Sequence, residues 1–244
     1  METNNPDTIY SSLLAAVDGF KFDQQVVNVF PDMIKRSVPG YTTIISMIGN
    51  LAERYAQSNS HCYDLGCSLG AATLAMRHRI LASDCTLVGI DNSAAMIDRC
   101  RQVIDADSGE LEVELICDDL QNVQLQPASV IVLNFTLQFI PVEQRPGILQ
   151  RLYDTLLPGG VLILSEKVAF DDTPHQDLMI ELHHNFKRSN GYSDLEIAQK
   201  RSSLENVLIP ETLETHRERL KSAGFHSSDV WFQCLNFASL IAIK

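Results

Sequence analysis

One short stretch, residues 63–72, constrains the fold of this chain more than any other part of it. It reads Y-D-L-G-C-S-L-G-A-A and lies between a strand-like run ending at Tyr63 and a helix-like run beginning at Ala71. Asp64 falls at the strand end, Gly66 at the turn and Gly70 at the head of the helix. Glycine permits a tight turn and close approach of a ligand, while a helix N-terminus offers free N–H groups. The pattern D-x-G-x-S-x-G therefore predicts a nucleotide-type binding loop between a strand and a helix.

Beyond this loop, short apolar runs alternate with longer amphipathic ones. Strands are expected at residues 62–65, 86–90, 112–117, 130–134 and 161–166, and helices at 71–81, 94–106 and 142–156. Short strands rich in Val, Ile and Leu, separated by helices, indicate βαβ crossovers and a parallel sheet. Residues 228–233 and 236–243 are close enough to form a terminal hairpin. We predict an α/β, Rossmann-like fold similar to that of methyltransferases. Its mostly parallel seven-stranded sheet would end in a C-terminal antiparallel hairpin and carry a helical insert.

We expect the chain, residues 1–244, to form a single α/β domain that binds one nucleoside-type ligand. Its first part, residues 1–57, is predicted to be a helical segment. Within it, Pro31 divides residues 22–38 into two short helical pieces, and residues 44–56 form a helix. The helical insert is expected at residues 170–210, followed by a helix over 211–223.

Composition narrows the class of ligand. The chain has 244 residues and a formal net charge of −12, whereas proteins that grip nucleic acid over a large surface are more often basic. No apolar run approaches the ~20 residues that span a bilayer, and the N-terminus lacks the features of a signal peptide. The six cysteines form no C-x-x-C pair and no metal-type cluster with histidine. We therefore expect a cytoplasmic protein with a small-molecule substrate, no metal, no membrane contact and no direct nucleic-acid contact.

Polar residues follow four successive predicted strands, at the edge where an open parallel sheet binds its ligand. Asp91 follows the second strand about twenty positions after Gly70, where a carboxylate accepts from both ribose hydroxyls. Asp118 or Asp119 follows the third strand and suits an adenine amino group, and Asn134 follows the fourth. Each has a plain alternative, because Asp91 suits a helix cap, the Asp pair suits a solvated turn, and Asn134 suits a local turn bond.

The insert places cations on an acidic protein. Lys187-Arg188 and Gln199-Lys200-Arg201 are interpreted either as solvated helix faces or as donors for an anionic substrate, since arginine binds carboxylates in a bidentate manner. His183 and His184 are adjacent, are expected to be solvated, and are assigned no role. No Ser-His-Asp or nucleophilic Cys pattern is present, so no catalytic residue is predicted.

Several motifs resemble those of the carboxy-S-adenosyl-L-methionine synthases. They are residues 29–34 (VFPDMI), 36–41 (RSVPGY), 63–74, 133–139 (LNFTLQF), 186–188 (FKR), 190–193 (NGYS), 199–201 (QKR) and 231–234 (WFQC). The resemblance implies transfer of a carboxyl group from prephenate to the methyl of S-adenosyl-L-methionine (SAM). It also implies a product, carboxy-SAM, that serves a partner enzyme modifying the wobble uridine of tRNA to 5-oxyacetyluridine. In the mechanism so implied, prephenate fragments to phenylpyruvate and CO2, and the hydroxide it loses deprotonates the methyl group that captures CO2.

The resemblance also implies a set of ligand contacts and a homodimer. Arg201 would hold the added carboxylate, in its own subunit or in the site of a partner subunit. The other positions would contact the nucleoside and methionine parts of SAM: Tyr41, Gly66, Cys67, Ser68, Asp91, Asn92, Asp119, Leu120 and Asn134.

Two other function classes remain open. One is a SAM-dependent methyltransferase acting on a small molecule or RNA, for which the insert arginine would have no obvious purpose. The other is a non-enzymatic module that binds the nucleoside as a sensor.

Overall fold

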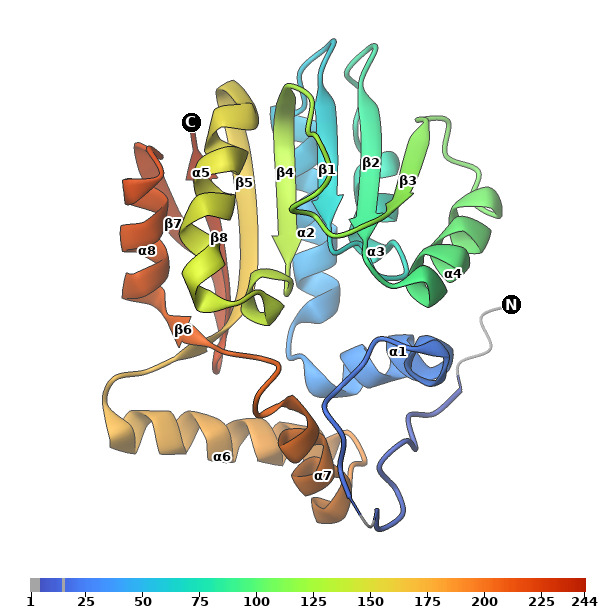
Figure 1. Ribbon diagram of the computed structural model, residues 1–244, viewed down its shortest axis with the longest axis vertical. Helices are drawn as coiled ribbons and strands as arrows, with labels where there is room; N and C mark the ends of the chain where they lie inside the picture. The colour runs from blue at the N-terminus through green and yellow to red at the C-terminus, as the bar shows by residue number, and fades with distance from the viewer. Residues whose placement is uncertain (1–4, 15) are drawn as a thin grey trace.

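The computed structural model describes residues 5–14 and 16–244, and a mixed sheet forms its centre (Figure 1). Seven strands run in the order β3-β2-β1-β4-β5-β8-β7, and a two-residue strand, β6, pairs with β5 beside this path. The five strands from β3 to β5 are parallel to their neighbours, whereas β8 is antiparallel to both β5 and β7. The strands are β1 His61–Leu65, β2 Thr86–Asp91, β3 Val113–Cys117, β4 Ala128–Asn134, β5 Leu156–Ala169, β6 Glu211–Thr212, β7 Ser227–Cys234 and β8 Phe237–Ile243. The predicted hairpin and the mostly parallel sheet are thus confirmed.

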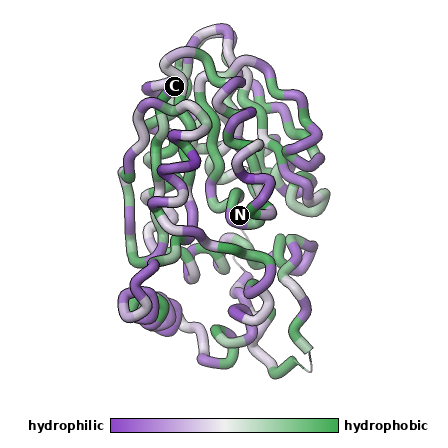
Figure 2. Tube along the Cα trace, turned by 60° about the vertical axis from the view of Figure 1, so that its left-hand side comes forward, coloured by the Kyte–Doolittle hydropathy of each residue, from purple (hydrophilic) through white to green (hydrophobic). Residues whose placement is uncertain are grey.

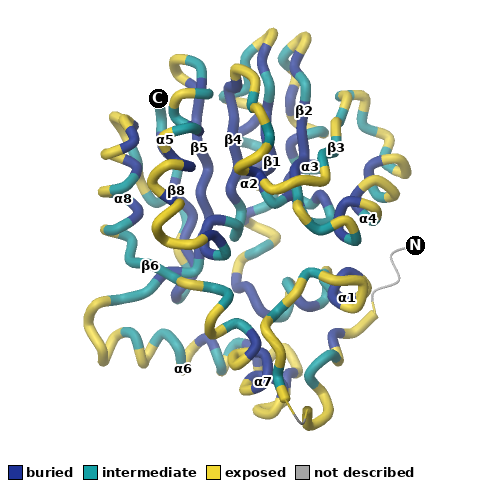
Figure 3. Tube along the Cα trace, viewed as in Figure 1, coloured by how far each residue is buried: buried dark blue, intermediate teal, exposed yellow. Residues whose placement is uncertain are grey.

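Helices cover both faces of the sheet. Alternation along β4 sends Val130 and Val132 into a core shared with α2 and α3, whereas Ile131 and Leu133 enter the core shared with α5 and α8. Figures 2 and 3 show the result, with hydrophobic and buried residues along the strands. The helices are α1 Gln24–Ser37, α2 Tyr41–Tyr55, α3 Ala71–Arg77, α4 Ala94–Asp105, α5 Arg145–Thr155, α6 Thr173–Ser189, α7 Asp194–Leu204 and α8 Leu213–Ser222, with 3-10 turns at Leu137–Phe139 and Val142–Gln144.

A third group of helices, α1, α6 and α7, lies across the carboxyl ends of the parallel strands (Figure 1). The last two belong to the predicted insert, which leaves the sheet after β5 and returns at β6. Within the described ranges, no helix combines the length and the apolar character that crossing a membrane requires. Because α6 and α7 lie at the carboxyl ends of the parallel strands, the insert is at the edge where an open α/β sheet binds its ligand.

Residues 5–14 and 16–23, which we call the N-terminal strap, run from α7 to α4. The Gln199 side chain forms hydrogen bonds of 2.8, 2.9 and 2.9 Å with three backbone groups of the strap. Phe20 N donates to Ser203 O at 2.9 Å, and Ser93 Oγ donates to Phe22 O at 2.6 Å. The strap is therefore bonded at one end to the insert and at the other to a helix of the sheet layer.

The prediction of two helical pieces around Pro31 is wrong, because α1 is continuous through that residue. Proline inside a helix removes a hydrogen bond and costs roughly 3 kcal/mol. Burial of Val26, Val27 and Met33 on one face of α1, against Met96 of α4, offsets that cost. Helices of the predicted 1–57 segment begin only at Gln24, since the described residues before it form turns and irregular chain.

Other boundaries differ from the expected ones by a few residues. The helix expected over 71–81 ends at Arg77, and the one expected over 142–156 begins with a 3-10 turn. The helix expected over 211–223 begins at Leu213 because Glu211 and Thr212 pair with β5, and Thr212 then caps the helix by accepting from Thr215 N.

Candidate nucleoside-binding site

The loop between β1 and α3 has the tight backbone that its glycines predict. Gly66 has φ +79°, and a Cβ placed on it would lie 2.3 Å from Thr136 Oγ1. Gly70 has φ +83° and directly precedes α3. Asp64, at the end of β1, is buried and accepts from Thr73 Oγ1 at 2.6 Å; burial raises the pKa of its carboxyl to about 6. Only glycine therefore fits at position 66, and the loop lies directly against the strand ends.

Asp91 connects this loop to the end of β2. Its two carboxylate oxygens accept separately from the backbone, one from Ser68 N and the other from Ser93 N, each at 2.9 Å. The cap of α4 is Ser93, whose hydroxyl accepts from Met96 N, so Asp91 does not cap that helix. Burial raises the pKa of Asp91, although both backbone bonds lower it. Each carboxylate oxygen keeps a lone pair with which it can accept from a ligand hydroxyl.

The polar residues after β3 and β4 complete the same edge. Asn92 Nδ2 donates to Asp119 Oδ1 at 2.7 Å, which joins the turns after β2 and β3. Asn134 Oδ1 is buried and has no hydrogen-bond partner among the described residues. A buried acceptor without a partner is costly unless a ligand supplies a donor, as the ammonium group of an amino acid would.

A cavity of about 380 Å³ lies between the strand ends and the helices below them. Nine of the ten residues predicted to contact the ligand line it: Tyr41, Gly66, Cys67, Ser68, Asp91, Asn92, Asp119, Leu120 and Asn134. The tenth, Arg201, is exposed on α7 and lies outside the lining. Burial lowers the pKa of Lys167 and of His184, and the charge of Arg201 lowers both further. The volume falls within the range of small-molecule sites.

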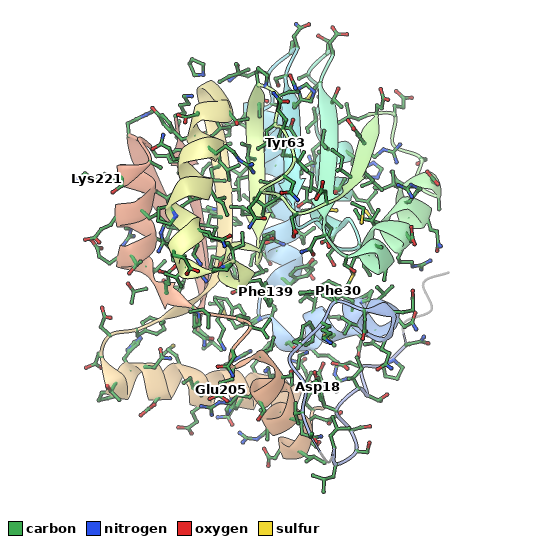
Figure 4. The ribbon with its side chains drawn as sticks, viewed as in Figure 1. Asp18, Phe30, Tyr63, Phe139, Glu205 and Lys221 are labelled. Atoms are coloured by element: carbon green, nitrogen blue, oxygen red, sulfur yellow. The ribbon has the colours of Figure 1, made fainter. Side chains whose placement is uncertain are left out.

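The residue pattern did not predict that aromatic side chains would form a wall of this cavity. Phe20 and Phe22 of the strap, Phe30 of α1 and Phe139 after β4 all line it. Phe30 and Phe139 are labelled in Figure 4, where they lie between the sheet and the helices beneath it. Apolar residues at helical or strand spacing are ordinary core residues by pattern, so only the fold distinguishes these as ligand-facing.

The insert contributes a basic end to the cavity. The expectation that His183 is solvated is wrong: its side chain is buried, its Nε2 lies 2.8 Å from Ser37 O, and its ring packs edge-on against Phe237 at 4.9 Å. Burial lowers the pKa of His183 to about 2. Lys187 and Lys200, which the sequence allowed as solvated helix faces, are buried and line the cavity with Lys167 of β5.

Comparison with known proteins separates matches to the core fold from matches that include the insert. A family model described as a methyltransferase domain matches residues 63–160, from β1 into β5. The chain also has the fold of human N-acetylserotonin methyltransferase, solved in complex with SAM, with a TM-score of 0.61 at 16% identity. That match covers 91% of this chain and 55% of the solved chain, so this chain spans about half the length of that structure.

Two curated relatives match over the whole chain, the insert included. One is a carboxy-S-adenosyl-L-methionine synthase from Trichlorobacter lovleyi, 61% identical over 99% of this chain and 100% of its own length. The other carries the same name, comes from Geobacter sp. (strain M21), and is 60% identical over the same shares.

Proposed function

We propose that this chain, which belongs to the carboxy-S-adenosyl-L-methionine synthase family, takes the carboxyl group that it transfers from prephenate. The enzyme is a transferase that uses SAM and forms carboxy-SAM. We further propose that it acts in the cytoplasm as a homodimer, with residues 1–244 as one domain. Its product would supply an enzyme that modifies the wobble uridine of tRNA.

The single observation that carries the proposal is the cavity between the sheet edge and the insert. Its acidic end fits the ligand, because Asp91 can accept from the ribose and Asn134 Oδ1 has no other described partner. Its basic end, on the insert, suits a second substrate with negative charge. When bound, SAM would supply a sulfonium whose methyl C–H bonds are acidified.

The chain's own residues would act by binding and by excluding water. No group in the lining is proposed as a strong base, because the hydroxide that prephenate loses can take the methyl proton. Phe22, Phe30 and Phe139 enclose the cavity with apolar surface. Proximity of the two substrates and the electrostatic interactions of the fixed charges would then provide the rate enhancement.

Incubating the enzyme with SAM and prephenate is expected to give phenylpyruvate together with a nucleoside that is one carboxyl group heavier, detected by mass spectrometry. Omitting prephenate should abolish the heavier nucleoside. If S-adenosylhomocysteine and a methylated acceptor accumulate instead, the enzyme is a plain methyltransferase. If neither product forms, the nucleoside is bound without turnover, as in a sensor.

Asp91→Asn is expected to weaken SAM binding by roughly 1.5–3 kcal/mol for each charge-assisted hydrogen bond lost to the ribose. The asparagine keeps the shape but only one acceptor oxygen, so either Ser68 N or Ser93 N also loses its acceptor, and the melting temperature is measured beside the affinity. Calorimetric titration of SAM measures the effect, with Asp98→Asn, an exposed position on α4, as the matched control. An unchanged affinity would leave Asp91 as a brace between Ser68 and Ser93 only.

A further inference from the structure

The cavity has two ends of opposite charge. Four carboxylates line it, and all of them lie at the ends of β1, β2 and β3: Asp64, Asp91, Asp118 and Asp119. Three lysines line it from β5 and the insert: Lys167, Lys187 and Lys200. Among the described lining residues, β5, α6 and α7 contribute no carboxylate. One ligand with a ribose and an amino-acid group accounts for the acidic end and leaves the lysines unexplained.

Lys200 has an evident structural role. Its Nζ lies 3.1 Å from Ser37 Oγ and 3.6 Å from Asp7 Oδ2, a carboxylate of the strap. Ser37 is the last residue of α1, where a cation interacts favourably with the helix dipole. Its charge is therefore compensated within the chain.

Lys187 and Lys167 are different. Lys187 is only 7% exposed, and neither its ammonium nor that of Lys167 has a hydrogen bond or ion pair with any residue the structure describes. Burial, followed by repulsion from Lys200 and Lys167, lowers the pKa of Lys187 to about 7. A buried charge without a partner is strongly unfavourable, so a bound anion would relieve that cost for Lys187 and would also pair with the half-buried Lys167.

The surface beside these lysines is apolar and aromatic. His183, one helical turn before Lys187, packs on Phe237, which packs on Phe135 with ring centroids 6.0 Å apart. Phe135 in turn lies 6.4 Å from the ring of Tyr41, a residue predicted to contact the nucleoside ligand. A ring that bears one carboxylate directly and a second on a side chain would match an apolar surface bordered by two cations.

We propose that Lys187 and Lys167 form the binding subsite for the carboxylates of the second substrate, a cyclic dicarboxylate held beside the nucleoside. The proposal rests on the proposed function, which names that substrate as prephenate. Lys187 and Lys167 act here as binding residues, and Arg201 is left to hold the carboxylate once it has been transferred.

The test is a calorimetric titration of prephenate into enzyme saturated with S-adenosylhomocysteine, which lacks the reactive methyl group. Lys187→Gln and Lys167→Gln are each expected to weaken prephenate binding about 10- to 100-fold, as loss of a charged hydrogen bond predicts. Lys35→Gln, at an exposed position of α1, should leave prephenate binding unchanged. Affinity for S-adenosylhomocysteine and the melting temperature should stay close to wild type in all three, since removing an unpaired buried charge does not harm folding.

Equal prephenate affinity in wild type and both glutamine variants would overturn the subsite, and so would equal losses for prephenate and S-adenosylhomocysteine. Failure of the proposed function gives a different result, namely no carboxylated nucleoside from the wild-type enzyme in the turnover assay. The titration then still decides the subsite, because wild-type enzyme that does not bind prephenate refutes it directly.

The pH dependence of prephenate affinity distinguishes a lysine that binds the substrate from one with a structural role only. A dianion favours the charged form of Lys187, whose pKa is lowered to about 7, so prephenate affinity should fall as pH rises through that value. Burial lowers this pKa most, Lys200 of α7 and Lys167 of β5 lower it further, and Asp7 of the strap raises it. His183 and His184 lie on the same helix, and burial keeps the pKa of each lowered. Lys187→Arg, which stays charged, should make the profile flatter between about pH 6 and pH 8; an identical profile in this variant would contradict the assignment.

Discussion

Arg201→Ala is expected to abolish the preference of the enzyme for carboxy-SAM over SAM. The two ligands differ by one carboxylate, and a carboxylate that loses its bidentate partner in a closed site is penalised by about 3–5 kcal/mol. Affinity for SAM itself should change much less, because SAM lacks that carboxylate. Competitive titration of the two ligands measures the difference. Arg188→Ala is the matched control, since Arg188 is exposed on the same insert and pairs with Asp194 at 2.7 Å.

Arg201→Lys should restore only part of the preference, because an ammonium cannot reproduce the planar fork of guanidinium. Arg201 is exposed and lies outside the cavity lining, so in the proposed homodimer the partner subunit would have to enclose it. Mixing Arg201→Ala subunits with subunits that carry Asp91→Asn tests this idea. If Arg201 reaches the partner's site, mixed dimers should regain one intact site; if it acts in its own site, none of the activity returns. Equal losses for both ligands in Arg201→Ala would instead make the residue structural.

Arg145→Ala is expected to lower the free energy of unfolding by about 3–5 kcal/mol, which is the usual cost of removing one member of a buried ion pair. Arg145 is fully buried and forms an ion pair with Glu211, to which Arg219 also donates at 2.5 and 2.8 Å. Its other nitrogens donate to three backbone carbonyls, at 2.9, 3.0 and 3.1 Å, which the alanine variant would leave unpaired. Chemical denaturation measures the change.

The control for that variant is Arg79→Ala, which removes an exposed pair with Glu53 at 3.2 Å. Exposed pairs contribute at most about 1 kcal/mol, so this variant should unfold close to wild type. A loss in Arg145→Ala no larger than in Arg79→Ala would show that the cluster around Glu211 does not hold β6 and α8 to the sheet.

The loop after β1 could be predicted because its requirements are local. Glycine at positions 66 and 70 indicates a backbone conformation that other residues adopt only with strain. Asp91, about twenty positions later, indicates the end of the next strand. The sheet followed from the alternation of short β-branched runs with helices for the same reason. The interpretation of Pro31 was wrong because its local cost is offset by the burial of other α1 side chains, which a single sequence does not display.

The burial of Lys187, Lys200 and His183 could not be predicted from the sequence. A cation on an amphipathic helix is solvated in most proteins, and nothing in the order of residues says that α6 and α7 turn these side chains inward. Their burial arises from contacts distant along the chain, such as those of Ser37 with both His183 and Lys200. The residue pattern offered Arg201 only as one of several insert cations, and the resemblance to a known family singled it out; in the structure it lies outside the cavity lining.

The strap also has a consequence for how binding of one substrate affects binding of the other. It is bonded to α7 through Ser203 and to α4 through Ser93, and between those bonds Phe20 and Phe22 form part of the cavity wall. Both substrates would contact this wall, so a shift of the strap that one of them causes would change the affinity for the other, and the two affinities would be thermodynamically linked. Linkage is reciprocal: whatever factor the nucleoside adds to the affinity of the dicarboxylate, the dicarboxylate adds to that of the nucleoside. Such cooperativity would keep the enzyme from enclosing either substrate tightly until both are present.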